Sequence, residues 1–276
     1  MSRPELQGPP ELYYDASVAS TYSANQHTIS IQSDLTNRCL DLIYLPEASC
    51  CVLDIGCGSG LSGDVISERG HEWVGIDISA PMLQVGQARE VDGDLIYGDM
   101  GQLQRFRPGV FDGAVSISAI QWLCQSNKKT EDPYKRACTF FQWLVRCLAA
   151  GARAALQFYP SHAEQTEVLL SAAMRAGFEG GLVVDYPNSS RAKKYYLCLW
   201  NGSPFGVNNQ MPQALTDEKS TVEVGRRAKC TKTVKKGKPA QGTKEWILKK
   251  KERRRRLGLP VRPDTKYTGK KRKDRF

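Results

Sequence analysis

Three carboxylates stand beside glycines near the ends of short apolar segments. Asp54 lies within a run of apolar residues, two positions before Gly56, and Asp77 ends the next such run. Asp99 follows Gly98 directly after a third run. Carboxylate oxygens accept hydrogen bonds from hydroxyl, amino and ammonium groups. The spacing therefore predicts a site for a ligand that carries several such donors.

A glycine-rich turn separates the first two carboxylates. The segment Gly56-Cys57-Gly58-Ser59-Gly60 follows a buried strand and opens a helix. Glycines let the backbone approach a ligand closely and adopt angles that other residues avoid. Residues 58–63 also match the dinucleotide-binding pattern G-x-G-x-x-G, which is a weak signal when it stands alone. The turn is thus interpreted as a nucleotide-type cradle, with a tight turn that binds nothing as the alternative.

The carboxylates favour S-adenosylmethionine over NAD as the cofactor. Asp77 can accept the ribose hydroxyls of either ligand, whereas its alternative role as a helix N-cap is better filled by Ser79. Burial of the Asp54 carboxylate in an apolar strand costs free energy unless the group is paired. The amino group of a methionine moiety would supply a partner, whereas a pyrophosphate would be repelled. Asp99 can accept from an adenine amino group and Met100 can pack on the ring, although a plain turn role for Asp99 stays open.

An alternation of strands and helices must position these groups. Strands are predicted at residues 51–55, 73–78, 95–97, 114–118, 154–159, 182–185 and 195–200, and helices at 33–45, 61–69, 81–90, 133–150 and 164–176. Residues 1–12 are predicted to form an extended arm. Such alternation predicts an α/β fold, a mostly parallel sheet with helices on both faces. The last two strands have no helix between them, which predicts an antiparallel hairpin.

Charge divides the chain into two parts. Residues 1–200 carry 16 Lys and Arg against 22 Asp and Glu, whereas residues 201–276 carry 23 against 7. We therefore expect a globular domain over 1–200 and a linker with a basic, largely disordered RNA-binding tail over 201–276, in which residues 244–257 can form a helix. An import signal is the simpler interpretation of the tail, and both roles can hold.

Cysteine spacing and hydropathy set limits on the class of protein. The nine cysteines form no C-x-x-C pair, so we expect reduced thiols, no disulfide framework and no metal site. No apolar segment is long enough for a membrane span, and the polar, Pro-rich start does not resemble a signal peptide. We expect an intracellular protein that contacts no membrane.

Several motifs narrow the interpretation to a known family. The segments Asp54–Gly60, Asp77, Asp99 and Phe111–Val115 resemble the successive motifs of class I S-adenosylmethionine-dependent methyltransferases. A narrower resemblance is to the eukaryotic 18S rRNA guanine-N7 methyltransferase family. It is carried by residues 116–123, 157–160, 180–185 and 193–197, and also by both ends of the chain. The resemblance implies a Rossmann-like domain with a seven-stranded sheet that methylates one guanine of small-subunit rRNA, assists ribosome biogenesis in nucleus and cytoplasm, and works with a small zinc-binding activator protein.

The resemblance and the residue pattern together give a set of site residues. The predicted cofactor-binding residues are Asp54, Gly56, Cys57, Gly58, Ser59, Gly60, Asp77, Ile78, Asp99, Met100 and Ser116. Gln121, Trp122, Phe158 and Tyr159 are predicted to bind the target base, and core packing is an equal alternative for the aromatic residues. No catalytic base is predicted, because guanine N7 carries a free lone pair and no proton. Tyr13, Tyr14 and Tyr22 are candidates for a lid.

Two predictions concern partners and alternatives. The class I strand order that the resemblance implies places the strand Leu95–Tyr97 at a sheet edge, where the activator can add a strand unless a local loop or helix covers it. A methyltransferase acting on tRNA, protein or a small molecule, and an assembly factor with a mainly scaffolding role, are the alternative functions. The basic tail argues against a small-molecule substrate.

Overall fold

The predicted alternation produces one seven-stranded sheet in the computed structural model, which describes residues 4–126, 131–189, 192–202, 211–216, 244–256 and 261–264. The strand order is β3-β2-β1-β4-β5-β7-β6. The strands are β1 (Cys51–Ile55), β2 (Glu72–Asp77), β3 (Asp94–Tyr97), β4 (Phe111–Ile117), β5 (Leu148–Phe158), β6 (Glu179–Asp185) and β7 (Lys194–Trp200). The first five strands run parallel, and β7 pairs antiparallel with both β5 and β6. The predicted fold class and the closing hairpin are therefore confirmed.

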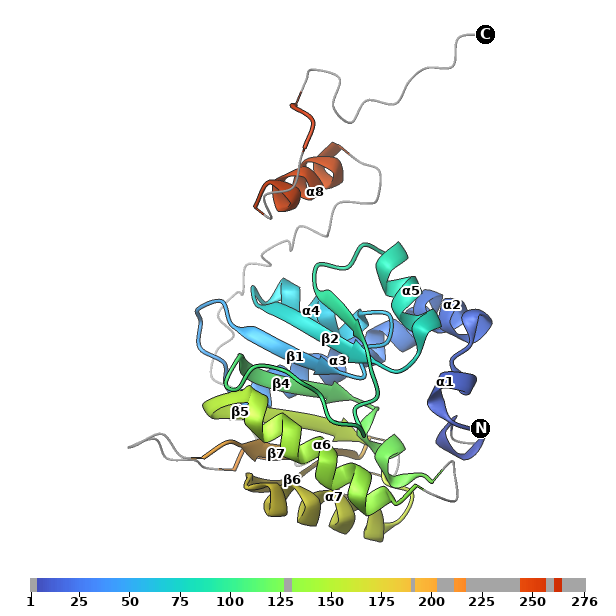
Figure 1. The fold of residues 1–276 in the computed structure, drawn as a ribbon, viewed down its shortest axis with the longest axis vertical. Helices are drawn as coiled ribbons and strands as arrows, with labels where there is room; N and C mark the ends of the chain where they lie inside the picture. The colour runs from blue at the N-terminus through green and yellow to red at the C-terminus, as the bar shows by residue number, and fades with distance from the viewer. Residues whose placement is uncertain are drawn as a thin grey trace, which may run out of the picture. The chain divides into compact units, whose positions relative to one another are not determined.

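Helices cover both faces of the sheet because each presents an apolar stripe to it. The helices α3 (Gln26–Ile43) and α4 (Leu61–Glu68) pack on one face with α5 (Ala80–Ala88) beside β2 and β3. The helices α6 (Pro133–Cys147) and α7 (Ala163–Ala176) pack on the other, as Figure 1 shows. Phe140, Phe141, Trp143 and Leu144 bury the apolar side of α6. The sheet is thus held between two apolar layers, and its carboxyl-end edge is left to the loops.

The N-terminal region differs from the predicted extended arm. It folds into the short elements η1 (Pro4–Leu6), α1 (Pro10–Tyr13) and α2 (Ala16–Ala24), none of which has a strong apolar periodicity. Asp15 caps α2 by accepting from the backbone N–H of Val18 at 2.8 Å. Asn25 caps α3, so that helix begins seven residues before the predicted start at Ser33. Side-chain caps fix these starts where periodicity gives little signal.

The predicted helix over 133–150 is too long at its end. The helix α6 stops at Cys147, and Leu148 is already extended as the first residue of β5. Leu148 pairs with Phe111 at the start of β4, ahead of a register irregularity between Phe111 and Gly113. Because Leu148 is buried and paired in the sheet, residues 148–150 belong to β5 and not to the helix.

A slot lined by glycines holds the indole of Trp73 between β2 and the helix α4. A Cβ on Gly63 would lie 2.0 Å from the ring, and a Cβ on Gly93 would lie 2.3 Å from it. Gly75 and Gly60 also border the ring, with Cβ positions at 2.8 and 3.2 Å. The indole N–H donates to Ser67 on α4 at 3.1 Å. This packing draws the start of α4 against β2 and so fixes the turn that precedes the helix.

The two edges of the sheet are finished differently. At the end of β6, residues 211–216 return to the sheet: Leu215 donates to the Asp185 carboxylate and accepts from the Tyr186 backbone, at 2.8 and 2.7 Å. Arg38 pairs with the same carboxylate at 2.8 Å. Within the part of the chain that the structure describes, no strand pairs with the outer side of β3, which lies at the edge as predicted.

The chain divides into two compact units, Met1–Glu218 and Lys219–Phe276. Residues 211–216 therefore belong to the first unit, beyond the expected division at residue 200. In the second unit α8 (Lys244–Arg256) forms where a helix is predicted. Asp264 bonds Lys251 at 2.8 Å and also pairs with Arg255. The rest of the predicted disordered tail lies outside the described residues.

Candidate functional site

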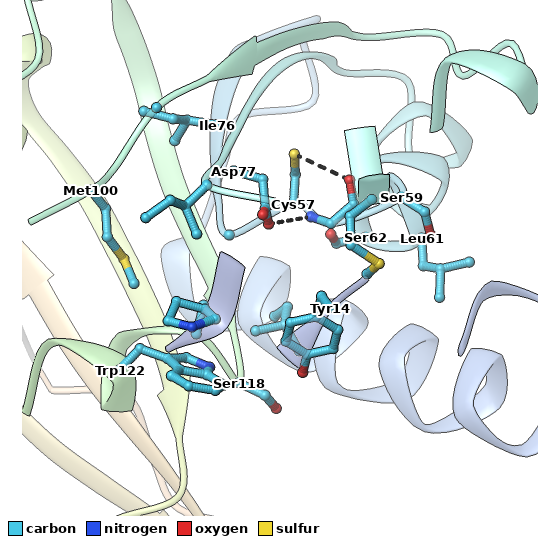
Figure 2. A pocket seen from close by; sticks show the side chains of 18 of the residues that line it. Tyr14, Cys57, Ser59, Leu61, Ser62, Ile76, Asp77, Met100, Ser118 and Trp122 are labelled. Carbon is cyan, nitrogen blue, oxygen red and sulfur yellow. Dashed lines mark hydrogen bonds between the residues drawn. The ribbon is translucent and has the colours of Figure 1, made fainter. Parts of the chain in front are cut away.

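A pocket lies at the carboxyl ends of β1, β2 and β4, where the predicted site residues meet (Figure 2). It is partly open to solvent and is lined by the ends of these strands and by the loops that follow them. The predicted residues that line it are Gly56, Cys57, Gly58, Ser59, Asp77, Ile78, Asp99, Met100 and Trp122. Most of the predicted cofactor residues are therefore brought to one cavity.

The turn from β1 to α4 forms one wall. Gly56 has a φ of +73° and Gly58 a φ of +53°, in the left-handed region that favours glycine. A Cβ on Gly56 would stand 2.3 Å from the Cβ of Ala119, and one on Gly58 would stand 2.8 Å from the end of Met82. The backbone N–H of Gly56 is tied to Ile76 at 2.8 Å. Because these glycines have no side chain, the backbone of the turn borders the cavity directly, and a ligand can approach it closely.

Asp77 lies at the centre of the pocket, held by two backbone donors. One carboxylate oxygen accepts from the N–H of Gly58, the bond drawn in Figure 2, and the other accepts from the N–H of Ser79, each at 2.8 Å. Burial raises the pKa of this carboxyl group, and the backbone hydrogen bonds oppose the rise. Ser79 caps α5, accepting from Met82 at 3.2 Å, so the capping role is taken by the serine. The Asp77 carboxylate is therefore oriented into the cavity to accept hydrogen bonds.

Asp54 lies directly behind the wall rather than on it. Its side chain is completely buried, and one carboxylate oxygen accepts from the Ser62 hydroxyl at 2.5 Å. The other oxygen, Oδ1, has no hydrogen-bond partner. Burial raises the pKa of Asp54 to about 7, with the Ser62 hydrogen bond lowering it and the charge of Asp77 raising it further. A buried oxygen without a hydrogen-bond partner costs free energy, so this half of the carboxylate is left unsatisfied by the described residues.

Asp99 forms an ion pair that the sequence did not reveal. Its carboxylate accepts two hydrogen bonds from the Arg136 guanidinium, both at 3.1 Å, and one from the N–H of Gly101 at 2.8 Å. Arg136 itself lines the pocket from the first turn of α6. The next residue, Met100, accepts from the Trp143 indole at 3.0 Å through its backbone oxygen. Two side chains of α6 thus fix the loop that follows β3.

Aromatic residues from the N-terminal helices close the pocket. Tyr14 and Tyr22 line it together with Trp122, and the Tyr14 and Trp122 rings lie 6.2 Å apart. The Tyr14 backbone accepts from Ser79 at 2.9 Å, and Ser23 donates to Ser59 at 2.7 Å. Burial raises the pKa of Tyr14 strongly and that of Tyr22 to about 12. Both phenols are therefore neutral at physiological pH.

Several predicted residues do not line the cavity. Ser116 is fully buried and donates to the Ile55 carbonyl at 2.8 Å, so its hydroxyl joins β4 to β1. Phe158 is 1% exposed and belongs to the core, which corrects its prediction as a surface for stacking a base. Gly60 lies in the turn against Trp73. For Ser116 and Phe158 the physical reason is strand parity, because neighbouring residues in a strand point to opposite faces of the sheet.

The other two base-binding candidates lie near the pocket without lining it. Gln121 is buried and donates to the Ser118 carbonyl at 2.8 Å, while its Oε1 atom has no partner. Ser118 lines the pocket with a φ of +56° and donates to Gln157 at 2.8 Å. Tyr159 follows β5, and the Lys194 ammonium lies 5.3 Å from the centre of its ring. Gln121 is therefore adjacent in sequence to Trp122, whereas Tyr159 interacts with Tyr22 on the pocket wall.

The described residues carry no group of three or more His, Cys, Asp or Glu side chains arranged to hold a metal ion. Among the same residues, no helix is both long and apolar enough to span a membrane.

Comparisons with known proteins identify two matching regions. Residues 52–136 match a family described as a methyltransferase domain, and residues 199–274 match one described as a methyltransferase involved in Williams-Beuren syndrome. The 18S rRNA (guanine-N(7))-methyltransferase of Mus musculus is 51% identical over 99% of this chain and 98% of its own. The 18S rRNA (guanine(1575)-N(7))-methyltransferase of Saccharomyces cerevisiae is 44% identical over the full length of both chains.

Solved structures support the fold. Phosphoethanolamine N-methyltransferase 2 of Haemonchus contortus, in complex with S-adenosyl-L-methionine, superposes with a TM-score of 0.51 at 16% identity. The match covers 69% of this chain and 58% of that one. At this identity the likeness concerns the architecture of the sheet and its helices.

Proposed function

The chain belongs to the 18S rRNA (guanine-N7)-methyltransferase family, and from this premise we propose how its pocket carries out the reaction. The enzyme binds S-adenosylmethionine at the ends of β1, β2 and β3 and transfers a methyl group to N7 of a guanine in small-subunit rRNA. The observation that carries this proposal is the identity of 44–51% over nearly the whole of each chain. The arrangement of three carboxylates around one cavity supports it.

The residues fit the cofactor group by group. Asp77 would accept the ribose hydroxyls, Asp99 the adenine amino group, and the bare backbone of Gly56–Gly58 would lie against the methionine part. The unpaired oxygen of Asp54 would gain a cationic neighbour in the amino group. When bound, the cofactor supplies a methyl group on a positively charged sulfur. The chain's own residues orient it and exclude water.

The target base would enter beside Trp122, whose ring lines the pocket and packs edge-on against the ring of Tyr14. Aromatic rings of this kind stack on bases that have been turned out of an RNA fold. Gln121 and Tyr159 would contact the base or its sugar as it enters. Because N7 of guanine already carries a lone pair in the ring plane, no residue needs to remove a proton. Catalysis then depends on holding N7 in line with the methyl group.

A methyl-transfer assay with mapping of the modified base tests this function. The full chain, alone and together with the small zinc-binding activator that the family resemblance implies, is incubated with S-adenosylmethionine and small-subunit rRNA or precursor particles. Methylation at one guanine N7 is the expected result. Methylation of tRNA or protein instead would favour the alternative substrates. Cofactor binding without any transfer, together with particle binding, would favour a scaffolding protein.

Cofactor affinity should depend on pH through Asp54. The pKa of this carboxyl group is about 7 in the free enzyme, so below pH 7 it is mostly protonated and must lose its proton to pair with the ligand's ammonium group. We expect the affinity for S-adenosylhomocysteine to rise about tenfold per pH unit between pH 5.5 and 6.5 and to level off above 7. Calorimetry in two buffers of different ionisation enthalpy measures the proton released.

The matched control for this pH dependence is Asp54→Asn. This variant keeps the size of the side chain and cannot titrate, so its weaker binding should not change with pH over the same range. Equal affinity of the natural protein at pH 5.5 and 7.5 would show that Asp54 does not respond to the ligand's ammonium group.

We further propose that the zinc-binding activator docks on the outer edge of β3. The strand is short, lies at the sheet edge and ends in Tyr97, which is 67% exposed. A second cavity beside it is lined by Leu83, Leu95 and Tyr97 among others. A strand added here would extend the sheet and cover these apolar groups. Met82, which precedes Leu83 on α5, lines the cofactor pocket and not this second cavity.

The variant Tyr97→Glu should weaken the complex with the activator at least tenfold. The substitution places a charge on the exposed end of the docking strand without touching the core, whereas Ile96 is half-buried against the core and would be a less specific probe. Co-purification and titration of the two proteins measure the effect. Met174→Glu, which charges another exposed apolar residue on α7, is the control that should bind normally. Normal binding by the Tyr97 variant would place the interface elsewhere.

The basic tail supports contact with RNA. The helix α8 carries eight Lys and Arg residues and two Glu in 13 positions. Lys250 lies over the Trp246 ring at 5.0 Å, which fixes one of these charges beside an aromatic surface. We propose that residues 219–276 bind the rRNA backbone and that the enzyme acts in the nucleus and cytoplasm, where small subunits are assembled.

A further inference from the structure

We propose that Arg136 is a positioning residue that makes Asp99 selective for the amino group of adenine. The inference rests on the proposed binding of S-adenosylmethionine in this pocket and assigns a role to a residue of α6. Arg136 lies 37 positions from Asp99 in the sequence, and the two meet only in the folded chain.

Hydrogen-bond capacity carries the argument. A carboxylate has about four lone-pair positions, two on each oxygen. Oδ1 of Asp99 accepts from Gly101 and from Nη2 of Arg136, so both of its positions are used. Oδ2 accepts from Nη1 of Arg136, which leaves one position. The remaining acceptor on Oδ2 matches a single N–H donor, as an adenine amino group offers.

The surroundings hold this arrangement in place. The Asp99 side chain is 12% exposed and that of Arg136 is 20% exposed, so the pair is largely shielded from solvent. Glu131 lies 3.7 Å from the same guanidinium. The absence of a side chain at Gly101 leaves room for the guanidinium, because a Cβ at this position would stand 2.7 Å from Cζ of Arg136. A planar guanidinium that binds both oxygens fixes the rotation of the carboxylate, which a single point charge would not do.

The consequence is discrimination between an amino group and a carbonyl at position 6 of the purine. An amino group donates to the free position on Oδ2. A carbonyl oxygen would face a negatively charged acceptor and receive no hydrogen bond. A site built to satisfy one donor rejects ligands that lack it, commonly by tenfold or more.

Calorimetry with two ligands tests the proposal without an activity measurement. The probes are S-adenosylhomocysteine and its deaminated analogue S-inosylhomocysteine, titrated into the full chain. The natural protein should bind the adenosyl ligand at least tenfold more tightly. Arg136→Met should lower this ratio to near one, and Arg136→Lys should retain only part of it. Arg146→Met, on an exposed position of the same helix, should leave the ratio unchanged.

Two further variants separate the possible failures. Gly101→Ala keeps both charges and only displaces the guanidinium, so it should also reduce the ratio even if Arg136→Met does not fold. Asp99→Asn should abolish the discrimination. If the ratio is lost in Asp99→Asn but unchanged in the folded Arg136 and Gly101 variants, the role of Arg136 is overturned and the adenine site stands. If the natural protein binds both ligands equally, Asp99 does not recognise the amino group and both assignments fail.

Discussion

The variant Asp77→Lys should lose measurable binding of S-adenosylmethionine. The substitution removes the acceptor at the centre of the pocket and places a cation beside a ligand that is itself positively charged. Hydrogen bonds to charged groups contribute roughly 1.5–3 kcal/mol each, so the loss of two weakens binding about a hundredfold or more. The change also frees the backbone N–H groups of Gly58 and Ser79, which loosens the turn. Isothermal titration calorimetry measures the affinity.

The matched control is Glu72→Lys, which makes the same change of charge at the other end of β2. Glu72 is exposed and lies outside the pocket, so this variant should bind the cofactor normally. Thermal unfolding of both variants separates a lost ligand contact from a lost fold. Unchanged affinity in a folded Asp77→Lys protein would exclude this carboxylate from the cofactor site.

Removal of residues 244–276 should leave cofactor affinity intact and strongly reduce the salt-sensitive part of RNA binding. The deletion takes away 15 Lys and Arg residues against 4 Asp and Glu. Each phosphate contact changes the slope of log K against log salt by about 0.7 on single strands. If five of these residues contact phosphates, the slope becomes shallower by roughly 3.5 and affinity at low salt falls by several orders of magnitude.

Fluorescence titrations with an rRNA fragment at several salt concentrations measure this slope. A second variant with Lys249, Lys250 and Lys251 replaced by Gln keeps the length of the tail and should reduce the slope by a smaller amount. Identical slopes for the natural and shortened chains would mean that the first unit alone supplies the phosphate contacts.

The sequence predicts the centre of this fold well because its signals there are local. The glycine turn and Asp77 are separated by a single helix, and short apolar runs in this alternation leave few topologies open. The start of α4 follows from that pattern, whereas the edge position of β3 follows from the strand order that the family resemblance implies.

Other parts of the site depend on contacts that no local pattern records. The helices α1 and α2 lack an apolar stripe and are anchored by polar contacts to the pocket, such as that of Ser23 with Ser59. Arg136 lies on a helix whose obvious signal is its buried aromatic face. Phe158 was misassigned because a single step along a strand changes the face to which a side chain points.

The glycine slot around Trp73 has a consequence for how this sequence can diverge. An indole that leaves no room for a methyl group at Gly63 or Gly93 makes these three positions one steric unit. Alanine at either glycine would be tolerated only with a smaller residue at 73, and a smaller residue at 73 would leave a void unless a glycine gained volume. Orthologues should therefore change these positions together or not at all, and a destabilising Gly63→Ala replacement should be rescued in part by Trp73→Phe. Such paired substitutions would record the packing of α4 on β2 as a covariation in sequence.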